Sequence, residues 1–462
     1  MVVFLLLIGA GGYFGLMAYH DITKILRGGG HSANLSGLNL AALQHEGDAR
    51  INVLVVGWDP PVDGDQTTDT IMIASIDPVN NTGSLISIPR DLWVKLPGCQ
   101  LFSEQKINAA YECAAGLNGL QDTNPRAGMA YLSKIVKAVT GVNINYVAVV
   151  DNQAFKTSVD AVGGVTIDIQ GTDPRGVLDR NFDWRCDYKC FLVKYPNGPV
   201  HLDGTQALYL AQARGDAVAP QYTGYGFANG DFERQQNQRK IVIGLAQSAK
   251  SISFLANPVK VLDFLNGLGT NVVTNISQSD ALKLIPIVEK IPFSKITSVD
   301  IPTSGSNAIL TTGGYDGLSV VEPTAGIFSY SQLQEFVRSN LIDPYIIKEH
   351  PTIALYNGTN VAGLAAQEAA VLKSYGYNVV SVATAPTQDY SQTVFYDTTG
   401  GALPVTKQYL QNRFGVKAQE SGLPTAFMTT STTLASKGRP AATTTKPVAQ
   451  YVIVLGQNFA NG

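Results

Sequence analysis

Short apolar runs separated by turn residues follow one another from residue 51 onward. Ile51–Val56, Thr70–Ile76 and Ser84–Ile88 are rich in β-branched residues and are bounded by Gly, Pro, Asn and Asp. This pattern is typical of buried strands joined by turns. The third run is followed by a Pro-Arg-Asp triplet, and proline cannot donate a hydrogen bond to a strand ladder. We therefore expect Arg90 and Asp91 to lie in a loop at the edge of a sheet.

Helical periodicity alternates with strand-like runs in the next part of the chain. Apolar residues recur at helical spacing over 129–140, and Gly141 follows as a C-terminal cap. Asp203 is placed to cap a further helix, and a long helix is expected from residue 231 to about residue 250. Such alternation predicts a layered α/β/α domain around a mixed central sheet, which we place at residues 50–345.

A second α/β pattern begins near residue 350. A strand over 353–356, an Ala-rich helix over 364–375 and a strand over 378–382 form a small βαβ unit. We therefore predict a separate, small C-terminal α/β domain over residues 350–462. Within it, the Thr-rich segment 428–447 has low complexity, and this composition predicts a mobile segment.

The first residues of the sequence are almost wholly apolar. The run from Val2 to Tyr19 approaches the length of about 20 residues that a membrane-spanning helix needs. We expect a transmembrane anchor over residues 1–20 and a Gly- and Ser-rich linker over residues 21–49. A signal sequence is the alternative, but no clear small-x-small cleavage site follows the run. Lys24 and Arg27 come after it, and the positive-inside rule alone would place the following chain in the cytoplasm.

The cysteines favour the opposite side of the membrane. Cys99, Cys113, Cys186 and Cys190 lie in polar, loop-like sequence, and an even count fits two structural disulfides in an oxidising compartment. We therefore expect an extracytoplasmic domain on a single-pass membrane protein. Zinc ligation is the weaker alternative, because the two pairs lack the tight spacing of zinc knuckles. The connectivity is not determined by the sequence, and pairing 99 with 113 and 186 with 190 is the local solution.

The overall charge limits the kind of partner. Lys and Arg number 33 and Asp and Glu number 36, which gives a net charge of −3 and a pI near 6.0. A nucleic acid held by bulk electrostatics is therefore excluded as a partner. Any site for an anion must be local.

Charged and polar residues gather where the apolar elements begin or end. They are Asp59, Asp69, Arg90, Asp91, Lys106, Arg214, Asp231, Arg234, Gln238 and Arg239. Paired carboxylates suit Mg²⁺, with Mn²⁺ as a substitute, and Mg²⁺ binds through one or two carboxylates together with substrate phosphates. Arginine is suited to clamping phosphate in a bidentate manner. The set therefore predicts a pyrophosphate ligand with a metal ion. Arg239 is expected to face solvent and is left out of this site.

Seven segments in this order resemble the LytR-CpsA-Psr family. They are Asp59 after a hydrophobic strand, T-D-T at 68–70, S-I-P-R-D at 87–91, K-I-N-A-A-Y at 106–111, V-D-A-V-G-G-V at 159–165, L-D-G-T-Q-A-L at 202–208 and G-D-F-E-R-Q-Q-N-Q at 230–238. Residues 357–363 and the strands around them resemble the LytR C-terminal domain that often accompanies this family.

The resemblance implies a function and assigns roles to residues. It implies an extracytoplasmic phosphotransferase that moves a glycan polymer, such as a teichoic acid, from a polyprenyl-pyrophosphate carrier onto peptidoglycan. By the same resemblance Asp59 and Asp69 would bind Mg²⁺. The pyrophosphate would be held by Arg90, Lys106, Arg214, Arg234 and Gln238, with Asp231 in support. Asp91 would support Arg90 or act as a base.

Two positions depart from the family pattern. Thr67 stands where an arginine is common, and Gln212 replaces the first arginine of an R-x-R pair that ends at Arg214. These departures remove one or two phosphate ligands. The family's lipid tail also needs an apolar tunnel, which the runs 241–246 and 252–255 would line unless they are ordinary core.

Two other functions remain open. A pyrophosphatase would hydrolyse the lipid carrier with water at the same site, and a scaffold would bind the cell wall without catalysis. The older description of the family as transcriptional regulators finds no support, because the sequence has neither a helix-turn-helix signal nor a basic patch.

Overall fold

The structure is a computed structural model. It describes residues 50–58, 68–115, 124–215, 225, 227, 230–249, 272–276, 280, 284, 287–288, 290–315, 317–433 and 442–460. The predicted anchor and linker over residues 1–49 lie outside this range. Within it, no helix combines the length and the apolar character needed to cross a membrane. The chain divides into two compact units, Ile51–Val337 and Arg338–Gly462, and each is described by itself.

The first unit is built on a six-stranded sheet with the order β11-β6-β1-β2-β3-β12. The strands are β1 (Ile51–Trp58), β2 (Thr68–Asp77), β3 (Thr82–Ser87), β6 (Tyr146–Asp151), β11 (Val272–Thr274) and β12 (Ile296–Val299). The β1-β6 and β3-β12 pairs are parallel and the other pairs are antiparallel. The predicted mixed α/β fold with a mixed central sheet is therefore confirmed.

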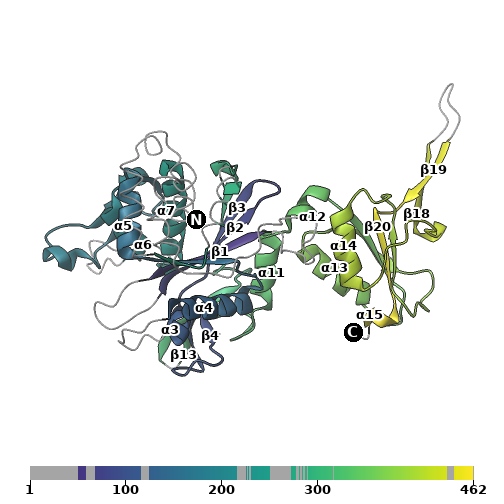
Figure 1. Ribbon diagram of the computed structural model, residues 1–462, viewed down its shortest axis with the longest axis horizontal. Coiled ribbons are helices and arrows are strands. Elements are labelled where there is room, and N and C mark those ends of the chain that lie inside the picture. Colours follow the sequence, from purple (N-terminus) through teal and green to yellow (C-terminus); the bar gives the residue numbers. More distant parts are fainter. Residues whose placement is uncertain are drawn as a thin grey trace. The chain divides into compact units, whose positions relative to one another are not determined.

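Helices lie on both sides of this sheet (Figure 1). One side carries α5 (Asn152–Ala161), α6 (Gly204–Gln212) and α7 (Asp231–Ala249), and the other carries α3 (Ala110–Ala115) and α4 (Pro125–Thr140). The amphipathic α4 ends at Gly141, which adopts the left-handed conformation expected of a cap. The helix α11 (Ser331–Asn340) packs on α4, where the Gln334 amide donates to the Ala138 carbonyl at 2.9 Å.

Two local features fix where α6 begins. Asp203 caps the helix as predicted, because its carboxylate accepts from the Gln206 backbone N–H and the Gln206 side chain accepts from the Asp203 N–H. Gly204 allows α6 to lie against α5, since a Cβ at this position would stand 2.3 Å from the Lys156 carbonyl oxygen. The end of α6, which leads to Arg214, is thereby held in position.

Shorter strand pairs surround the main sheet. They are β4 (Trp93–Lys95) with β5 (Glu104–Lys106), β7 (Val165–Ile169) with β10 (Gly198–Leu202), β8 (Val177–Asp179) with β9 (Val193–Tyr195), and β13 (Leu310–Tyr315) with β14 (Leu318–Pro323). Disulfides join Cys99 to Cys113 and Cys186 to Cys190, so both local pairings expected from the sequence form.

The second unit has a four-stranded sheet with the order β16-β15-β20-β17. Its strands are β15 (Thr352–Asn357), β16 (Asn378–Thr384), β17 (Val394–Asp397) and β20 (Tyr451–Leu455), and its helices are α12 (Pro344–Glu349), α13 (Leu364–Ser374), α14 (Pro404–Phe414) and α15 (Gln457–Ala460). The strands β15 and β16 are parallel and α13 connects them, which confirms the predicted βαβ unit.

The Thr-rich segment of the second unit contains two strands. β18 (Met428–Thr433) and β19 (Ala442–Pro447) pair in antiparallel register, and residues 434–441 lie outside the described residues, so the mobility expected from the low complexity of 428–447 stays a prediction. Threonine is β-branched and favours an extended backbone, so a run of threonines forms strands even where its composition is simple.

Candidate active site

Arg90 and Asp69 meet where β3 ends and β2 begins. These strands are antiparallel, with Met72 opposite Ser87, so the start of one adjoins the end of the other. Arg90 lies in the turn after β3, as predicted, and its guanidinium Nη1 forms an ion pair with the Asp69 carboxylate. Both side chains are partly accessible, with exposures of 17% and 29%.

Asp91 and Lys106 extend this charged cluster. The Lys106 ammonium lies 2.8 Å from Asp91 Oδ1, and Asp91 Oδ2 lies 3.7 Å from Arg90 Nε. Lys106 is the last residue of β5, directly before the 3₁₀ turn Ile107–Ala109. In that turn the Asn108 N–H donates to the Arg90 carbonyl at 3.2 Å. The carboxylate of Asp91 therefore connects two cations that come from separate elements.

Asp231, the first residue of α7, is surrounded by guanidinium groups. Its Oδ1 lies 2.7 Å from Arg234 Nη2, 3.7 Å from Arg214 Nε and 3.9 Å from Arg90 Nε. The three arginines differ in accessibility: Arg234 is 2% exposed, Arg90 17% and Arg214 46%. The cluster is therefore graded from a buried arginine to one that faces solvent.

Arg234 carries its charge in an unfavourable environment. Burial is the main cause that lowers its pKa, to about 10, and the neighbouring charges of Arg90 and Arg214 lower it further, while Asp231 and Asp69 oppose the shift. It remains protonated at neutral pH. The Nε atoms of Arg234 and Arg90 are buried and, among the described residues, neither finds a hydrogen-bond acceptor. Two charged donors of the cluster therefore lack an acceptor among the described residues.

The backbone of Arg214 is held by a residue that the sequence analysis missed. Asp179 ends β8 and is 1% exposed, and its Oδ2 accepts from the Arg214 N–H at 2.6 Å and from the Gly215 N–H at 2.9 Å. Like Asp59 and Asp151, it is a carboxylate that follows an apolar strand. That position is the signal that could have identified it.

Gln238 and Gln212 contribute to the wall of an apolar cavity beside the charged cluster. The cavity has a volume of about 100 Å³ and lies between strands β1 and β2 and helices α5, α6 and α7. Gln238 donates from Nε2 to the Ala211 carbonyl at 2.9 Å, which ties α7 to α6. Its assignment to the pyrophosphate stays a prediction. Gln212, at the position where the family pattern has arginine, also lines the cavity.

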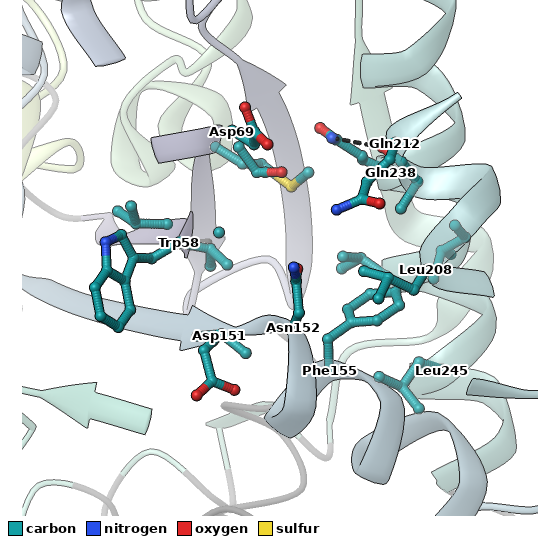
Figure 2. A pocket seen from close by; sticks show the side chains of 18 residues that line it. Trp58, Asp69, Asp151, Asn152, Phe155, Leu208, Gln212, Gln238 and Leu245 are labelled. Atoms are coloured by element: carbon teal, nitrogen blue, oxygen red, sulfur yellow. Dashed lines mark hydrogen bonds between the residues drawn. The ribbon is translucent and has the colours of Figure 1, made fainter. Parts of the chain in front are cut away.

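Figure 2 shows the side chains that line the cavity, among which Asp69 belongs to the charged cluster. Asp69, Gln212 and Gln238 lie at one end, and Phe155 and Leu245 lie at the other. The remaining wall is mainly aliphatic and includes Val55, Met72, Val150, Leu208, Ala211, Ile241 and Val242. Part of the run 241–246 therefore lines a cavity, as the tunnel interpretation requires, and the run 252–255 lies outside the described residues.

Arg239 does not face solvent. Its side chain is 2% exposed, donates from Nε to Ser298 Oγ at 2.6 Å and forms an ion pair with Asp300. Burial lowers its pKa, and Asp300 opposes the shift. The expectation of a solvent-facing arginine is wrong. Arg239 is buried because it connects α7 to Ser298 in β12 and to Asp300, the residue directly after that strand.

The structure describes one of the two predicted metal ligands, Asp69. Asp59 and Thr67 lie outside the described residues. Asp69 is described, and its second carboxylate oxygen accepts no hydrogen bond from any described residue. The described part of the chain contains no group of three or more His, Cys, Asp or Glu side chains arranged to hold a metal ion.

Comparison with known proteins identifies the family. A model described as "LytR_cpsA_psr family" matches residues 19–325, and one described as "LytR cell envelope-related transcriptional attenuator" matches residues 350–459. The resemblance seen in the sequence motifs is thereby confirmed.

Two named relatives are similar to part of this chain. The polyisoprenyl-teichoic acid–peptidoglycan teichoic acid transferase TagU of Enterococcus faecalis is 25% identical over 308 residues, which are 66% of this chain and 85% of TagU. TagV of Bacillus subtilis, with the same description, is 27% identical over 51% of this chain and 52% of its own length. The crystal structure of B. subtilis TagV covers 63% of this chain and 97% of that chain, with 24% identity and a TM-score of 0.43. Because the first family model spans well over half of the sequence, the chain belongs to the LytR-CpsA-Psr family.

Proposed function

We propose that this protein transfers a glycan polymer, of the teichoic acid type, from a polyprenyl-pyrophosphate carrier onto peptidoglycan through a phosphodiester. One observation carries the proposal. Three guanidinium groups, those of Arg90, Arg214 and Arg234, converge on Asp231 beside an apolar cavity. The descriptions of TagU and TagV as teichoic acid transferases support the same substrate class.

The juxtaposition suits a lipid-linked donor. A polyprenyl pyrophosphate has a doubly charged head and a long hydrocarbon tail, so it needs an anion site and an apolar wall next to each other. The partly exposed guanidinium groups of Arg90 and Arg214 supply charged hydrogen bonds for the head, and the buried charge of Arg234 adds to the positive potential. The aliphatic wall formed by α5, α6 and α7 receives the part of the tail nearest the phosphates.

Transfer would proceed by attack at phosphorus. A hydroxyl of the peptidoglycan acceptor attacks the phosphorus next to the glycan, the bond to the bridging oxygen breaks, and polyprenyl phosphate leaves with the proton of the attacking hydroxyl. Phosphoryl transfer passes through a loose transition state, so positioning and charge neutralisation account for most of the catalysis. In this proposal Arg90, Arg214 and Arg234 position the bridging and equatorial oxygens and neutralise their charge.

Asp91 acts through its neighbours in this scheme. Its two carboxylate oxygens face Lys106 and Arg90, so its negative charge holds both cations at the edge of the site. Of the two roles that the family resemblance allows for Asp91, support of Arg90 is the one that this contact favours.

We also propose that the site uses Mg²⁺, held by Asp69 and Asp59 together with phosphate oxygens of the donor. The cations Arg90, Lys106, Arg214 and Arg234 and the carboxylates Asp69, Asp91 and Asp231 leave a net charge of 4 − 3 = +1. This falls short of neutralising a doubly charged pyrophosphate, and one Asp69 oxygen accepts no hydrogen bond from the residues that the structure describes. When bound, Mg²⁺ would neutralise charge on the pyrophosphate. This assignment is tested by calorimetry, in which Mg²⁺ is titrated into the protein in the presence of a pyrophosphate lipid, for the wild type and for Asp69→Asn.

The proposed location is the outer face of the cell membrane, with a single N-terminal anchor. Two disulfides in the first unit support an oxidising compartment. Labelling of the native chain in intact cells with a membrane-impermeant reagent tests the location.

The reaction is tested by supplying a lipid-linked glycan and a muropeptide acceptor together and analysing the products by mass spectrometry. A glycan joined to the muropeptide through a phosphodiester is expected. Free phosphate and released glycan, without the joined product, would indicate a hydrolase instead. Arg90→Ala should lower the rate by about 10²-fold or more, as loss of one charged donor does in other active sites.

A matched variant separates catalysis from a scaffold role. Lys134→Ala removes an exposed cation from α4, on the other side of the sheet, and should leave transfer unchanged. If Arg90→Ala also left attachment of the polymer to the wall unchanged in cells, the protein would be a wall-binding scaffold and the proposal would fail.

A further inference from the structure

The loop between β8 and β9 presents three large aromatic side chains to solvent. Trp184, Tyr188 and Phe191 are 57%, 62% and 44% exposed. Aromatic side chains of this size normally bury most of their surface in a protein core. Three of them within eight positions, all turned outward, indicate a surface that is covered by something else. We call residues 180–194, which comprise this loop and the first two residues of β9, the stapled loop.

The stapled loop is held rigidly from inside. The Cys186–Cys190 disulfide closes its tip, and Asp183, which has no exposed surface, accepts from the Leu192 N–H at 2.9 Å and from Arg180 Nε at 2.6 Å. Arg180 Nη2 also donates to the Tyr188 carbonyl at 3.1 Å. The aromatic side chains are therefore exposed by a fixed backbone and not by a frayed one.

The tip of the loop has an unfavourable backbone conformation. Asp187 and Tyr188 have φ values of 51° and 57°, and two consecutive non-glycine residues in the left-handed region are uncommon. Such conformations persist where the surrounding structure enforces them, and they cluster at functional surfaces. Here the enforced conformation places Tyr188, the most exposed aromatic residue of the three, at the tip.

Cations accompany the aromatic rings. The guanidinium of Arg185 lies 4.5 Å from the Trp184 ring centroid, and the Lys194 ammonium lies 4.6 Å from that of Phe191. Arg185, Lys189 and Lys194 are all exposed. The acidic residues are arranged differently: Asp179 and Asp183 are buried, and the exposed Asp187 lies 3.5 Å from Lys189. The outer surface of the loop is therefore aromatic and positively charged.

We propose that the stapled loop docks on the surface of an anionic lipid membrane, with Trp184, Tyr188 and Phe191 in the interfacial region and Arg185, Lys189 and Lys194 at the headgroups. Tryptophan and tyrosine favour the membrane interface, and basic residues are attracted to anionic lipids. A sugar-stacking surface is the less favoured alternative, because cations already cover one face of Trp184 and of Phe191.

Docking would also orient the candidate active site. Asp179 directly precedes the loop and holds the backbone of Arg214 and Gly215. Asp179 thus connects the proposed lipid-contacting loop to Arg214, the most exposed arginine of the charged cluster. The inference rests on the proposed membrane location of the protein, and it does not depend on the transfer reaction.

Tryptophan fluorescence provides a direct test with the full chain. Of the chain's three tryptophans, Trp93 is 3% exposed, whereas Trp58 is half-buried and lines the cavity proposed for the lipid tail, so the measurement is made in a Trp58→Phe background in which Trp184 is the remaining exposed tryptophan. The full chain is combined with phosphatidylcholine vesicles whose acyl chains are brominated, with and without phosphatidylglycerol. We expect the Trp184 emission to shift to the blue and to be quenched, more strongly with the anionic lipid. Trp184→Phe should abolish the quenching.

The cations are tested with a matched control. Arg185→Gln, Lys189→Gln and Lys194→Gln should each shift the docking equilibrium about fivefold toward the undocked state, as loss of one basic residue near an anionic surface does. Lys134→Gln and Lys137→Gln on α4 should have no effect. Tyr188→Ser keeps the Trp184 reporter and should also weaken the quenching.

Two results would overturn the proposal. Quenching that survives Trp184→Phe would come from another part of the chain. An unquenched Trp184 whose emission instead responds to a soluble cell-wall glycan would identify the loop as a glycan-binding surface. Because the vesicles contain neither polyprenyl carrier nor acceptor, these results are independent of whether the protein is a transferase.

Discussion

The carboxylate of Asp179 accepts hydrogen bonds from the backbone N–H groups of Arg214, at 2.6 Å, and of Gly215, at 2.9 Å. These hydrogen bonds fix the backbone at the end of α6, from which the Arg214 side chain extends. Asp179 does not contact the Arg214 guanidinium itself. A buried carboxylate of this kind is costly to replace, because three backbone donors depend on it: Arg214 and Gly215 at one oxygen, and Asn181 at the other, at 2.7 Å.

We expect Asp179→Asn to raise the KM for the lipid-linked donor about tenfold, since a neutral amide oxygen holds the Arg214 backbone less tightly. The exposed Asp168→Asn on β7 is the matched control. The decisive measurement is a double-mutant cycle in the transfer assay: in an Arg214→Ala background, Asp179→Asn should have little further effect. Fully additive effects would mean that Asp179 has only a structural role.

Replacing Arg234 should separate stability from activity. Arg234→Met removes a buried charge whose desolvation lowers its pKa to about 10, while Asp231 keeps Arg90 and Arg214 as neighbours. We expect an unchanged or raised melting temperature together with a loss of transfer of about 10²-fold. A drop in melting temperature that matched the loss of transfer would contradict this.

The pH dependence of that stability difference follows from the sign of the shift. A lowered pKa means that the unfolded state binds the proton more tightly, so the burial penalty of Arg234 is fully present below about pH 10 and declines only above it. The stability difference between wild type and Arg234→Met should therefore be constant between neutral pH and about pH 9, as measured by urea denaturation at several pH values.

Filling the cavity should discriminate between donors by their lipid. Val242 lines the cavity on α7, and Val242→Phe would occupy part of its volume of about 100 Å³. We expect lower affinity for a long polyprenyl donor and unchanged affinity for a pyrophosphate with a short, soluble tail. Equal effects on both donors would argue that the cavity does not receive the lipid. Val200→Phe, on β10 outside the cavity lining, provides the comparison.

The two disulfides should contribute differently. The Cys99–Cys113 bridge spans 14 positions, and replacing both cysteines by serine should cost about 3 kcal/mol of unfolding free energy. The Cys186–Cys190 bridge spans 4 positions and should cost less, while its loss should weaken lipid quenching of Trp184. Urea denaturation and the vesicle assay, applied to both variants, distinguish the two roles.

Removing the half-exposed Asp300 carboxylate, the charged partner of the buried Arg239, should destabilise the fold without changing the candidate site. Asp300→Asn leaves the 2% exposed Arg239 with Ser298 as a neutral partner, and we expect a loss of about 1–3 kcal/mol of stability. Transfer per folded molecule should stay the same. A change in the KM for the donor would show that Arg239 also affects the pyrophosphate cluster.

The sequence alone determined the features that depend on neighbouring residues. A proline after an apolar strand placed Arg90 and Asp91 in the turn after β3, and Asp203 predicted the start of α6. Both disulfides close short loops, so the local pairing was the correct one. The order of the motifs was sufficient for recognition of the family before any contact was known.

Only the tertiary structure decided which of these residues meet. Asp231 meets Arg90 and Arg214, which come from outside α7, in addition to Arg234 on its own helix. Asp179 accepts from the Arg214 backbone 35 positions along the chain, and Arg239 pairs with Asp300, 61 positions away. The cavity likewise exists only between packed layers. Periodicity and capping report energies within a few residues, whereas these contacts depend on how separate elements pack, and a single sequence does not contain that information in its local pattern.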